Sequence, residues 1–276
     1  MTQIKVLNNS GRKLNGFAKN IELLADQIAP LVEDISRLKL PDTVVIRLMT
    51  PQAWRRARSR HDMRRMMAEA SKLKPSTDSM RTATLTAKAA RIDRRKTWAA
   101  VGGEFVDFTN GAEIVILPAA LQEMGLLGSN ESHSMVLAHE LAHGAQHHVD
   151  AGMTWAQMKT HFPRERGTCD RSYGFLLEGH AHWVAHAITA RLHGQSTTVK
   201  PGEGATSRHQ SIHDSAEQQG YRRFHDRALQ CVSKVIEDNG VEQFNRVWNA
   251  PELVPLVSES SNTEDWPQRL ADELAK

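Results

Sequence analysis

Apolar residues near the N-terminus recur at helical spacing, and a run of β-branched residues follows them. The spacing predicts an amphipathic helix within residues 14–40 that ends near Pro30 or resumes after it. Residues Thr43–Met49 are β-branched or apolar and are flanked by prolines, which predicts a strand. The apolar positions of the first helix are Leu14, Phe17, Ile21, Leu24 and Ile28.

A long polar stretch and a hairpin come next. A basic helix is predicted from about Pro51 to Leu73, and Lys74–Asp78 breaks it before a second polar helical stretch. Trp98–Phe108 and Glu113–Leu117 read as two strands joined around Thr109–Gly111, because Asn-Gly between apolar runs is a usual hairpin signal.

Helical patterns fill the remainder of the chain. The glycine-bearing segment Gly194–Gln210 separates two of these helices and could be a mobile loop or a lid. A small sheet followed by helices predicts a predominantly helical α+β fold, with residues 1–97 packed on a core formed by residues 98–276. The predicted helices are 130–150, 153–162, 170–194, 214–239, 241–248 and 264–275.

Composition sets the class of protein. The chain has 276 residues of which 40% are hydrophobic, as expected of a globular protein. No apolar run reaches the roughly 18 residues of a membrane span, and no signal peptide is visible, so we expect a cytoplasmic protein without membrane contact. Cys169 and Cys231 are too few and too far apart to indicate a disulfide framework, and we interpret them as small buried residues.

The net charge of +3 conceals an uneven distribution. Residues 47–96 hold fifteen Lys and Arg against four Asp and Glu. The pattern is typical of a solvated basic helical face, and nucleic acid or an acidic partner is the alternative interpretation. Only Trp54 supplies an aromatic ring in this segment, which disfavours a base-stacking platform.

The stretch HELAHGAQHH, from His139 to His148, contains the HExxH motif. Helical residues four apart lie on one face, so the imidazoles of His139 and His143 can converge on one metal ion with Glu140 beside them. The flanking residues are apolar, and burying these groups without a partner would be costly, which favours a metal. His147 would lie about 12 Å from His139 along the helix axis, too far to join the same ion.

A catalytic zinc ion needs a third protein ligand and an open position. Glu178 in the apolar stretch FLLEGHAHW is the first candidate, and His182, one turn further along, is the competitor. His180 and His186 in the same region are expected to support a ligand or to be structural.

Two motifs and the C-terminal segment resemble a known family. HELAH, followed by LLEGHAHW and by a tail with Gly240–Pro255 and Glu264–Trp266, is similar to the zincin-like type 2 family of zinc-dependent metallopeptidases. The resemblance covers about His133 to the C-terminus.

The resemblance implies a zincin-like core, with the small sheet beside the HExxH helix, and one zinc ion per chain. Carried over by position, His139, His143 and Glu178 are the ligands and Glu140 is the catalytic carboxylate. Thermolysin-like glutamate zincins have an Asp four residues after the ligand Glu, where this chain has His182. Another acid, for which Asp150 and Asp170 are guesses, or a backbone carbonyl must then orient a zinc-bound imidazole.

The expected reaction is hydrolysis of a peptide or protein substrate by a zinc-activated water, with Glu140 as general base. Tyr173, Tyr221 and His213 are candidate donors to the oxyanion. The hairpin 98–117 is expected to offer a sheet edge to the substrate. The alternative is a zinc-binding protein without proteolytic activity that uses residues 47–96 to bind nucleic acid or a partner. The sequence does not indicate an oligomeric state.

Overall fold

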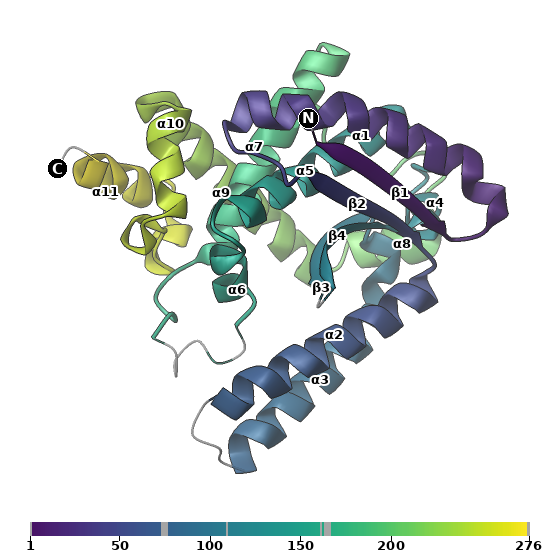
Figure 1. Ribbon diagram of the computed structural model, residues 1–276, viewed down its shortest axis with the longest axis horizontal. Helices are drawn as coiled ribbons and strands as arrows, with labels where there is room; N and C mark the ends of the chain where they lie inside the picture. The colour runs from purple at the N-terminus through teal and green to yellow at the C-terminus, as the bar shows by residue number, and fades with distance from the viewer. Residues whose placement is uncertain (1, 73–76, 109, 161, 163–166, 275–276) are drawn as a thin grey trace.

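One four-stranded sheet and a surrounding set of helices form the protein, which confirms the predominantly helical α+β prediction (Figure 1). The computed structural model describes residues 2–72, 77–108, 110–160, 162 and 167–274. The strands are β1 (Gln3–Asn9), β2 (Thr43–Met49), β3 (Gly103–Phe108) and β4 (Gly111–Ile116). The α-helices are α1 (Asn15–Ser36), α2 (Pro51–Lys72), α3 (Thr77–Thr97), α4 (Pro118–Glu123), α5 (Asn130–Val149), α6 (Met153–Met158), α7 (Tyr173–His193), α8 (Ser207–His213), α9 (Ala216–Asn239), α10 (Val241–Phe244) and α11 (Asp265–Leu274). Short 3-10 helices are η1 (Arg12–Leu14), η2 (Trp98–Ala100), η3 (Asn245–Trp248), η4 (Pro251–Leu253) and η5 (Ser258–Ser261).

The sheet has the strand order β1-β2-β4-β3 and is mixed. β1 pairs with β2 and β2 with β4 in parallel, whereas β3 pairs with β4 antiparallel and forms one edge. The sequence analysis did not predict β1, because Ile4 is its sole buried residue and polar residues end the strand. β1, α1 and β2 share one sheet and one hydrophobic core with the elements that follow residue 97, whereas the buried apolar residues of α2 and α3 belong to separate smaller clusters.

Several predicted boundaries moved. α1 runs through Pro30, which is exposed, so the carbonyl that loses its helical donor can bond to water while buried Ala29 and Val32 hold the helix to the core. Residues 98–100 form η2 instead of the start of a strand, and α6 ends at Met158. Lys74–Ser76 of the predicted break and Thr109 of the predicted turn lie outside the described residues.

Helix α5 lies at the centre of the fold. It packs against α1 and α7 and contacts β3 and β4, while α7 packs in turn against α9. Leu137 and Leu141 of α5 and Phe175 of α7 are fully buried in the same core as the sheet residues Ile46 and Ile114. Burial of about 25 cal/mol per Å² of apolar surface stabilises this packing, which fixes α5 and α7 relative to each other.

The helices α2 and α3 form a hairpin that projects from the sheet (Figure 1). It leaves β2 and returns through η2 to β3, so it is inserted between neighbouring parts of the sheet. Across the described residues, no helix has both the length and the apolar character required to cross a membrane.

Candidate metal centre

Helix α5 presents the HExxH residues inside the protein. Its first turn is capped by Ser129, whose side chain accepts a hydrogen bond from the backbone N–H of Ser132. Glu140 and His143 are buried, although both are polar, and His139 is mostly buried. The helical repeat places His139 and His143 on the face turned toward α7, which carries Glu178.

Three donor groups converge at this interface. His139 Nε2 lies 3.3 Å from Glu178 Oε2, His143 Nε2 lies 3.8 Å from Glu178 Oε1, and the two Nε2 atoms are 3.0 Å apart. Ligand atoms about 2.0–2.1 Å from a tetrahedral zinc ion lie roughly 3.3 Å from one another. The spacing of the three groups therefore fits one tetrahedral ion.

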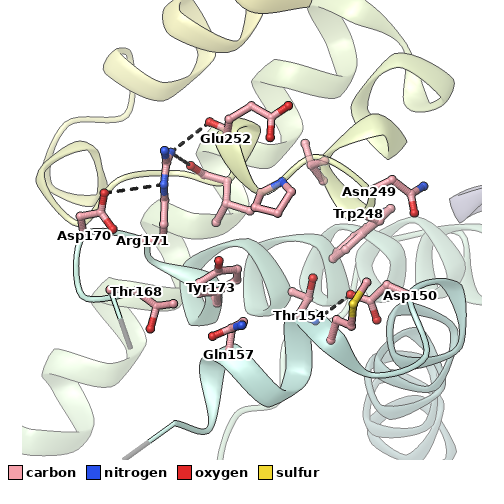
Figure 2. A pocket seen from close by; sticks show the side chains of 15 residues that line it. Asp150, Thr154, Gln157, Thr168, Asp170, Arg171, Tyr173, Trp248, Asn249 and Glu252 are labelled. Carbon is pink, nitrogen blue, oxygen red and sulfur yellow. Dashed lines mark hydrogen bonds and ion pairs between the residues drawn. The ribbon is translucent and has the colours of Figure 1, made fainter. Parts of the chain in front are cut away.

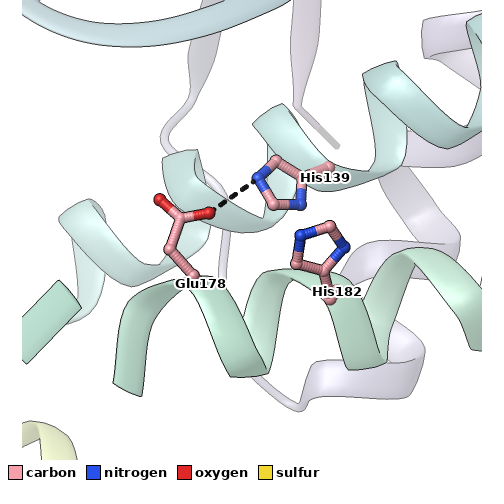
Figure 3. A group of neighbouring side chains, drawn as sticks. All are labelled: His139, Glu178 and His182. Carbon is pink, nitrogen blue, oxygen red and sulfur yellow. Dashed lines mark ion pairs between the residues drawn. The ribbon is translucent and has the colours of Figure 1, made fainter. Parts of the chain in front are cut away.

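His182 belongs to the same cluster, one helical turn after Glu178. Ligand atoms of His139, Glu178 and His182 all lie within 4.8 Å of one another, and this group could hold a metal ion (Figure 3). The set with His143 and the set with His182 share His139 and Glu178. His182 Nε2 also lies 3.4 Å from Nδ1 of His225 on α9.

Gln146 orients His143 from behind. Its Oε1 is 2.7 Å from His143 Nδ1, and its Nε2 donates to the carbonyl of Leu177 at 3.0 Å and to His180 Nδ1 at 2.9 Å. When Nδ1 of His143 donates to Gln146, Nε2 of the neutral ring is left as an acceptor, which is the tautomer that a metal ion at this position would need. Gln146 thus orients the imidazole of His143, the role for which the sequence analysis expected a carboxylate or a backbone carbonyl.

Neither guessed carboxylate supports a histidine. Asp150 accepts hydrogen bonds from the backbone N–H groups of Gly152 at 2.9 Å and Thr154 at 2.7 Å and so caps α6. Asp170 lies beside Arg171, 3.9 Å away, with most of its side chain exposed. The guess failed because helical position alone does not show which side chain reaches an imidazole.

Burial and mutual interaction perturb the titration of these groups. Burial would raise the pKa of Glu178, but hydrogen bonds from His139 and His143 hold that pKa well below its ordinary value. Burial lowers the pKa of His139 and brings that of His182 down to about 2. Burial would lower the pKa of His143, but its interactions with Glu178, Glu140 and Gln146 raise it. A metal ion requires neutral imidazoles and an ionised carboxylate, so its binding would release the proton of any protonated imidazole.

Glu140 faces the edge strand β3. Burial raises its pKa to about 7, and the negative charge of Glu178 adds to the shift although His143 opposes it. The backbone of Phe105 donates a hydrogen bond to its carboxylate. A Cβ atom at Gly103 would lie 2.6 Å from Val136 Cγ1 and 3.1 Å from Glu140 Cγ, so glycine allows the strand to approach α5 this closely.

The cluster opens into a cleft of about 520 Å³ between β3, α3, α6 and α9. Trp155, packed 5.2 Å from the ring of His143, forms part of the wall. A smaller hollow of about 200 Å³ adjoins the same residues. Its lining is mainly apolar and includes Met124, Met135, Val136 and Val199.

The other predicted site residues lie at different distances from the cluster. Tyr221 lines the cleft on α9, where its ring is 5.2 Å from that of His225. His180 is buried behind the site and stacks on Phe244 at 5.3 Å. His213 lies at the end of α8, 3.0 Å from Asp214.

Tyr173 lines a different cavity of about 510 Å³, formed by α6, the start of α7 and the segments around η3 and η4 (Figure 2). Arg171 in this cavity donates to the carbonyls of Glu252 and Val254, both at 3.0 Å. The side chain of Tyr173 is therefore separated from the metal cluster.

The sequence analysis missed His225 and Gln146. His225 Nε2 lies 3.9 Å from Glu178 Oε2, and no pattern connects it with the motifs on α5 and α7. One signal was available: His225 stands four residues after Tyr221, so both share a face of a predicted helix. Gln146 stands three residues after His143, so the two side chains are neighbours on the helix. Because this part of the helix is buried, the Gln146 amide needs a hydrogen-bond partner within the protein.

Comparison with known proteins supports a fold and little more. No family model matches the chain, and no curated protein matches it. A solved structure from Chloroflexus aurantiacus, described provisionally as a hydrolase with a novel fold, is similar with a TM-score of 0.59 and 17% sequence identity. The similarity covers 95% of this chain and 92% of that one, so the two share their fold over nearly the whole length.

Proposed function

We propose that the protein is a cytoplasmic zinc-dependent metallopeptidase of the zincin-like type. One observation supports this most strongly: two histidines and a glutamate meet at tetrahedral spacing, and Glu140 lies in the next position of the same motif. The provisional assignment of the structural neighbour as a hydrolase agrees with this class of reaction. A purely structural zinc site would more often be closed by four protein ligands and would need no adjacent base.

His139, His143 and Glu178 would hold the ion. When bound, zinc supplies Lewis acidity that activates a water molecule and polarises the scissile carbonyl. Glu140 would take the proton of the attacking water and pass it to the leaving amine, a role for which a pKa of about 7 is suitable. The Phe105 N–H holds the Glu140 carboxylate in place for this transfer.

The peptide would lie along β3. This strand is an edge, whereas β4 is paired on both sides, so β3 is the part of the predicted hairpin that can add a substrate strand. The apolar hollow beside Glu140 is suited to a substrate side chain of moderate size next to the scissile bond. Tyr221 and His225 face the cleft from α9, and we assign to them the stabilisation of the developing oxyanion.

The test is Glu140→Gln, which removes the base and retains the shape of the side chain. We expect zinc content to stay near one ion per chain while turnover of peptides selected from a library falls by about 10²–10⁴-fold. Glu131→Gln, in the exposed first turn of α5, is the matched control and should leave both quantities unchanged.

Unchanged turnover in Glu140→Gln would refute the peptidase proposal. Bound zinc without turnover in the unmodified protein, across the whole library, would favour the alternative function, a zinc-binding protein that works through its basic segment.

A further inference from the structure

Among the described residues, the arginines on one face of the hairpin α2–α3 form ion pairs, and those on the other face do not. On the face toward the sheet, Arg58 lies 3.0 Å from Asp62 and 3.1 Å from Glu104, and Arg94 lies 2.6 Å from Asp62. Arg65 lies 3.5 Å from Asp107 on β3. These pairs attach the hairpin to the sheet and neutralise the charge of that face.

The opposite face forms a groove of about 410 Å³ between the two helices. Five arginines line it together with one glutamine and one serine, and no acidic residue takes part. Across the described part of the chain, none of these arginines has an ion-pair partner, and all but Arg55 are exposed. The residues are Gln52, Arg55, Arg56, Ser59 and Arg60 of α2 and Arg91 and Arg95 of α3.

The basic track extends beyond the groove. Arg64 follows Arg56 and Arg60 at four-residue spacing on α2, and Lys88 precedes Arg91 by three residues on α3; both are exposed. Five guanidinium groups in one groove repel one another, and a bound anion would offset that repulsion. Guanidinium matches phosphate with two parallel hydrogen bonds, and two rows of such groups suit a ligand with repeated phosphates.

We propose that the groove of α2–α3 binds the phosphate backbone of a double-stranded nucleic acid. On α2 the basic track runs from Gln52 to Arg64, about 18 Å along the helix axis, which is roughly half of the 34 Å of one duplex turn. On the described part of the hairpin, the aromatic side chains are Trp54 and His61, and Trp54 is buried. The described surface of the hairpin therefore offers no large aromatic ring on which single-stranded bases could stack. The groove lining also holds no apolar side chain that would enter a membrane.

The groove is adjacent to the metal cleft through α3. Asp93, Arg94 and Thr97 line the cleft, whereas Arg91 and Arg95, within the same two turns, line the groove. A bound duplex would therefore lie next to the cleft. The proposal does not depend on peptidase activity, and duplex binding is expected equally of Glu140→Gln.

The experiment measures fluorescence anisotropy of a labelled 20-base-pair DNA duplex with the full chain between 50 and 200 mM salt. Arg60→Glu with Arg95→Glu should weaken binding at least about tenfold at 100 mM salt and reduce the slope of log affinity against log salt by roughly two. The control variant is Lys13→Glu with Lys19→Glu, which makes the same change in net charge at exposed positions near the N-terminus, outside the hairpin. It should alter affinity by less than about threefold. Arg56→Gln with Arg91→Gln, a milder pair, should give an intermediate loss.

Other probes decide between kinds of partner. A duplex RNA of the same length tests whether the backbone alone is recognised, and comparable affinity supports the proposal. Three outcomes would overturn it: no duplex binding at 50 mM salt, equal losses in the groove and control variants, or tighter binding to a single strand or to phosphatidylserine vesicles than to the duplex. A thermal melt of each variant establishes that a loss does not come from unfolding.

Discussion

Two cavities of nearly equal volume differ in how the charged and metal-ligating side chains that line them are partnered. The cavity that contains Tyr173 and the cleft above the HExxH helix have volumes of about 510 and 520 Å³. In the first, Arg171 bonds to backbone carbonyls and Asp150 caps a helix, so charged groups are satisfied by the protein. In the second, His139, His143 and Glu178 face one another at a point that a cation fits.

The difference teaches that volume does not identify a functional site in this fold. Convergence of donor groups in a buried place is the better criterion for a candidate site, because such groups are stable only with a partner or in a shifted protonation state. Among the described residues, His139 Nδ1 and His225 Nε2 of the cleft are buried without a hydrogen-bond partner, and so are Gln157 Oε1 and Thr168 Oγ1 of the other cavity. Unpartnered polar atoms therefore occur in both cavities, and the converging imidazoles and carboxylate set the cleft apart. The predictions below compare changes at or behind the cleft with changes elsewhere in the protein.

Glu178→Ala should have the largest effect. Removal of the third ligand is expected to lower zinc content from about one ion per chain to none after mild dialysis against a chelator, as measured by elemental analysis. At a zinc concentration about 1,000 times the dissociation constant, the unmodified protein should gain about 4 kcal/mol in its free energy of unfolding, which the variant should not. Asp170→Ala at the other cavity should keep its zinc, and equal zinc content in the two variants would remove Glu178 from the site.

Gln146→Leu should weaken the centre without removing a ligand. His143 would lose the group that fixes its proton on Nδ1, and such changes typically reduce metal affinity by about 10–100-fold. Competition with a fluorescent zinc chelator measures the loss. Gln157→Leu, in the other cavity, is the control, and a similar loss in both variants would mean that Gln146 acts only through packing.

His180 should make the metal-free protein sensitive to acid. Burial lowers its pKa to about 3, below the value of 6.5 for an unfolded chain, so the unfolded state binds a proton between these values and the folded state does not. The stabilisation is complete above pH 6.5 and decreases as the pH falls, by about 2 kcal/mol at pH 5. Urea unfolding at pH 7.5 and pH 5 should show a smaller decrease for His180→Phe, whereas replacing exposed His148 by leucine should leave the decrease unchanged.

Asp150→Ala should have the smallest effect. The variant loses the cap of α6, which costs about 1 kcal/mol in the free energy of unfolding. Zinc affinity should not change, because Asp150 belongs to the other cavity. A drop in zinc affinity comparable with that of Gln146→Leu would show that the two cavities are coupled.

The sequence predicted best where one periodic pattern decided the structure. The strand Thr43–Met49 has the predicted bounds, and helix α5 differs from the prediction by one residue at its end. The sequence predicted poorly the elements whose formation depends on contacts between residues distant in the chain. β1 is stable as a parallel partner of β2, and nothing local in its residues shows that pairing.

The candidate site divides in the same way. His139, Glu140 and His143 follow from helix geometry, and Glu178 from a carboxylate in an apolar stretch. His225 reaches the cluster from α9, and its position depends on the packing of α9 against α7, which the sequence does not display. Gln146 was overlooked for a chemical reason: a carboxylate was expected behind the imidazole, and a buried amide can accept the same hydrogen bond without bringing another charge.

The segment after α7 has a mechanical consequence. Gly202 N–H bonds to the carbonyl of Met124 at 2.8 Å and Thr206 N–H to that of Glu123 at 2.9 Å, while a Cβ atom at Gly202 would lie 2.5 Å from the carbonyl oxygen of Gly125. Thr197 N–H bonds to Thr189 of α7. The stretch for which the sequence analysis considered a mobile loop or a lid is thus hydrogen-bonded to the end of α4 and to α7. Under the proposed function, a long substrate would enter the cleft past exposed Asp93, Glu217 and Tyr221, which belong to α3 and α9.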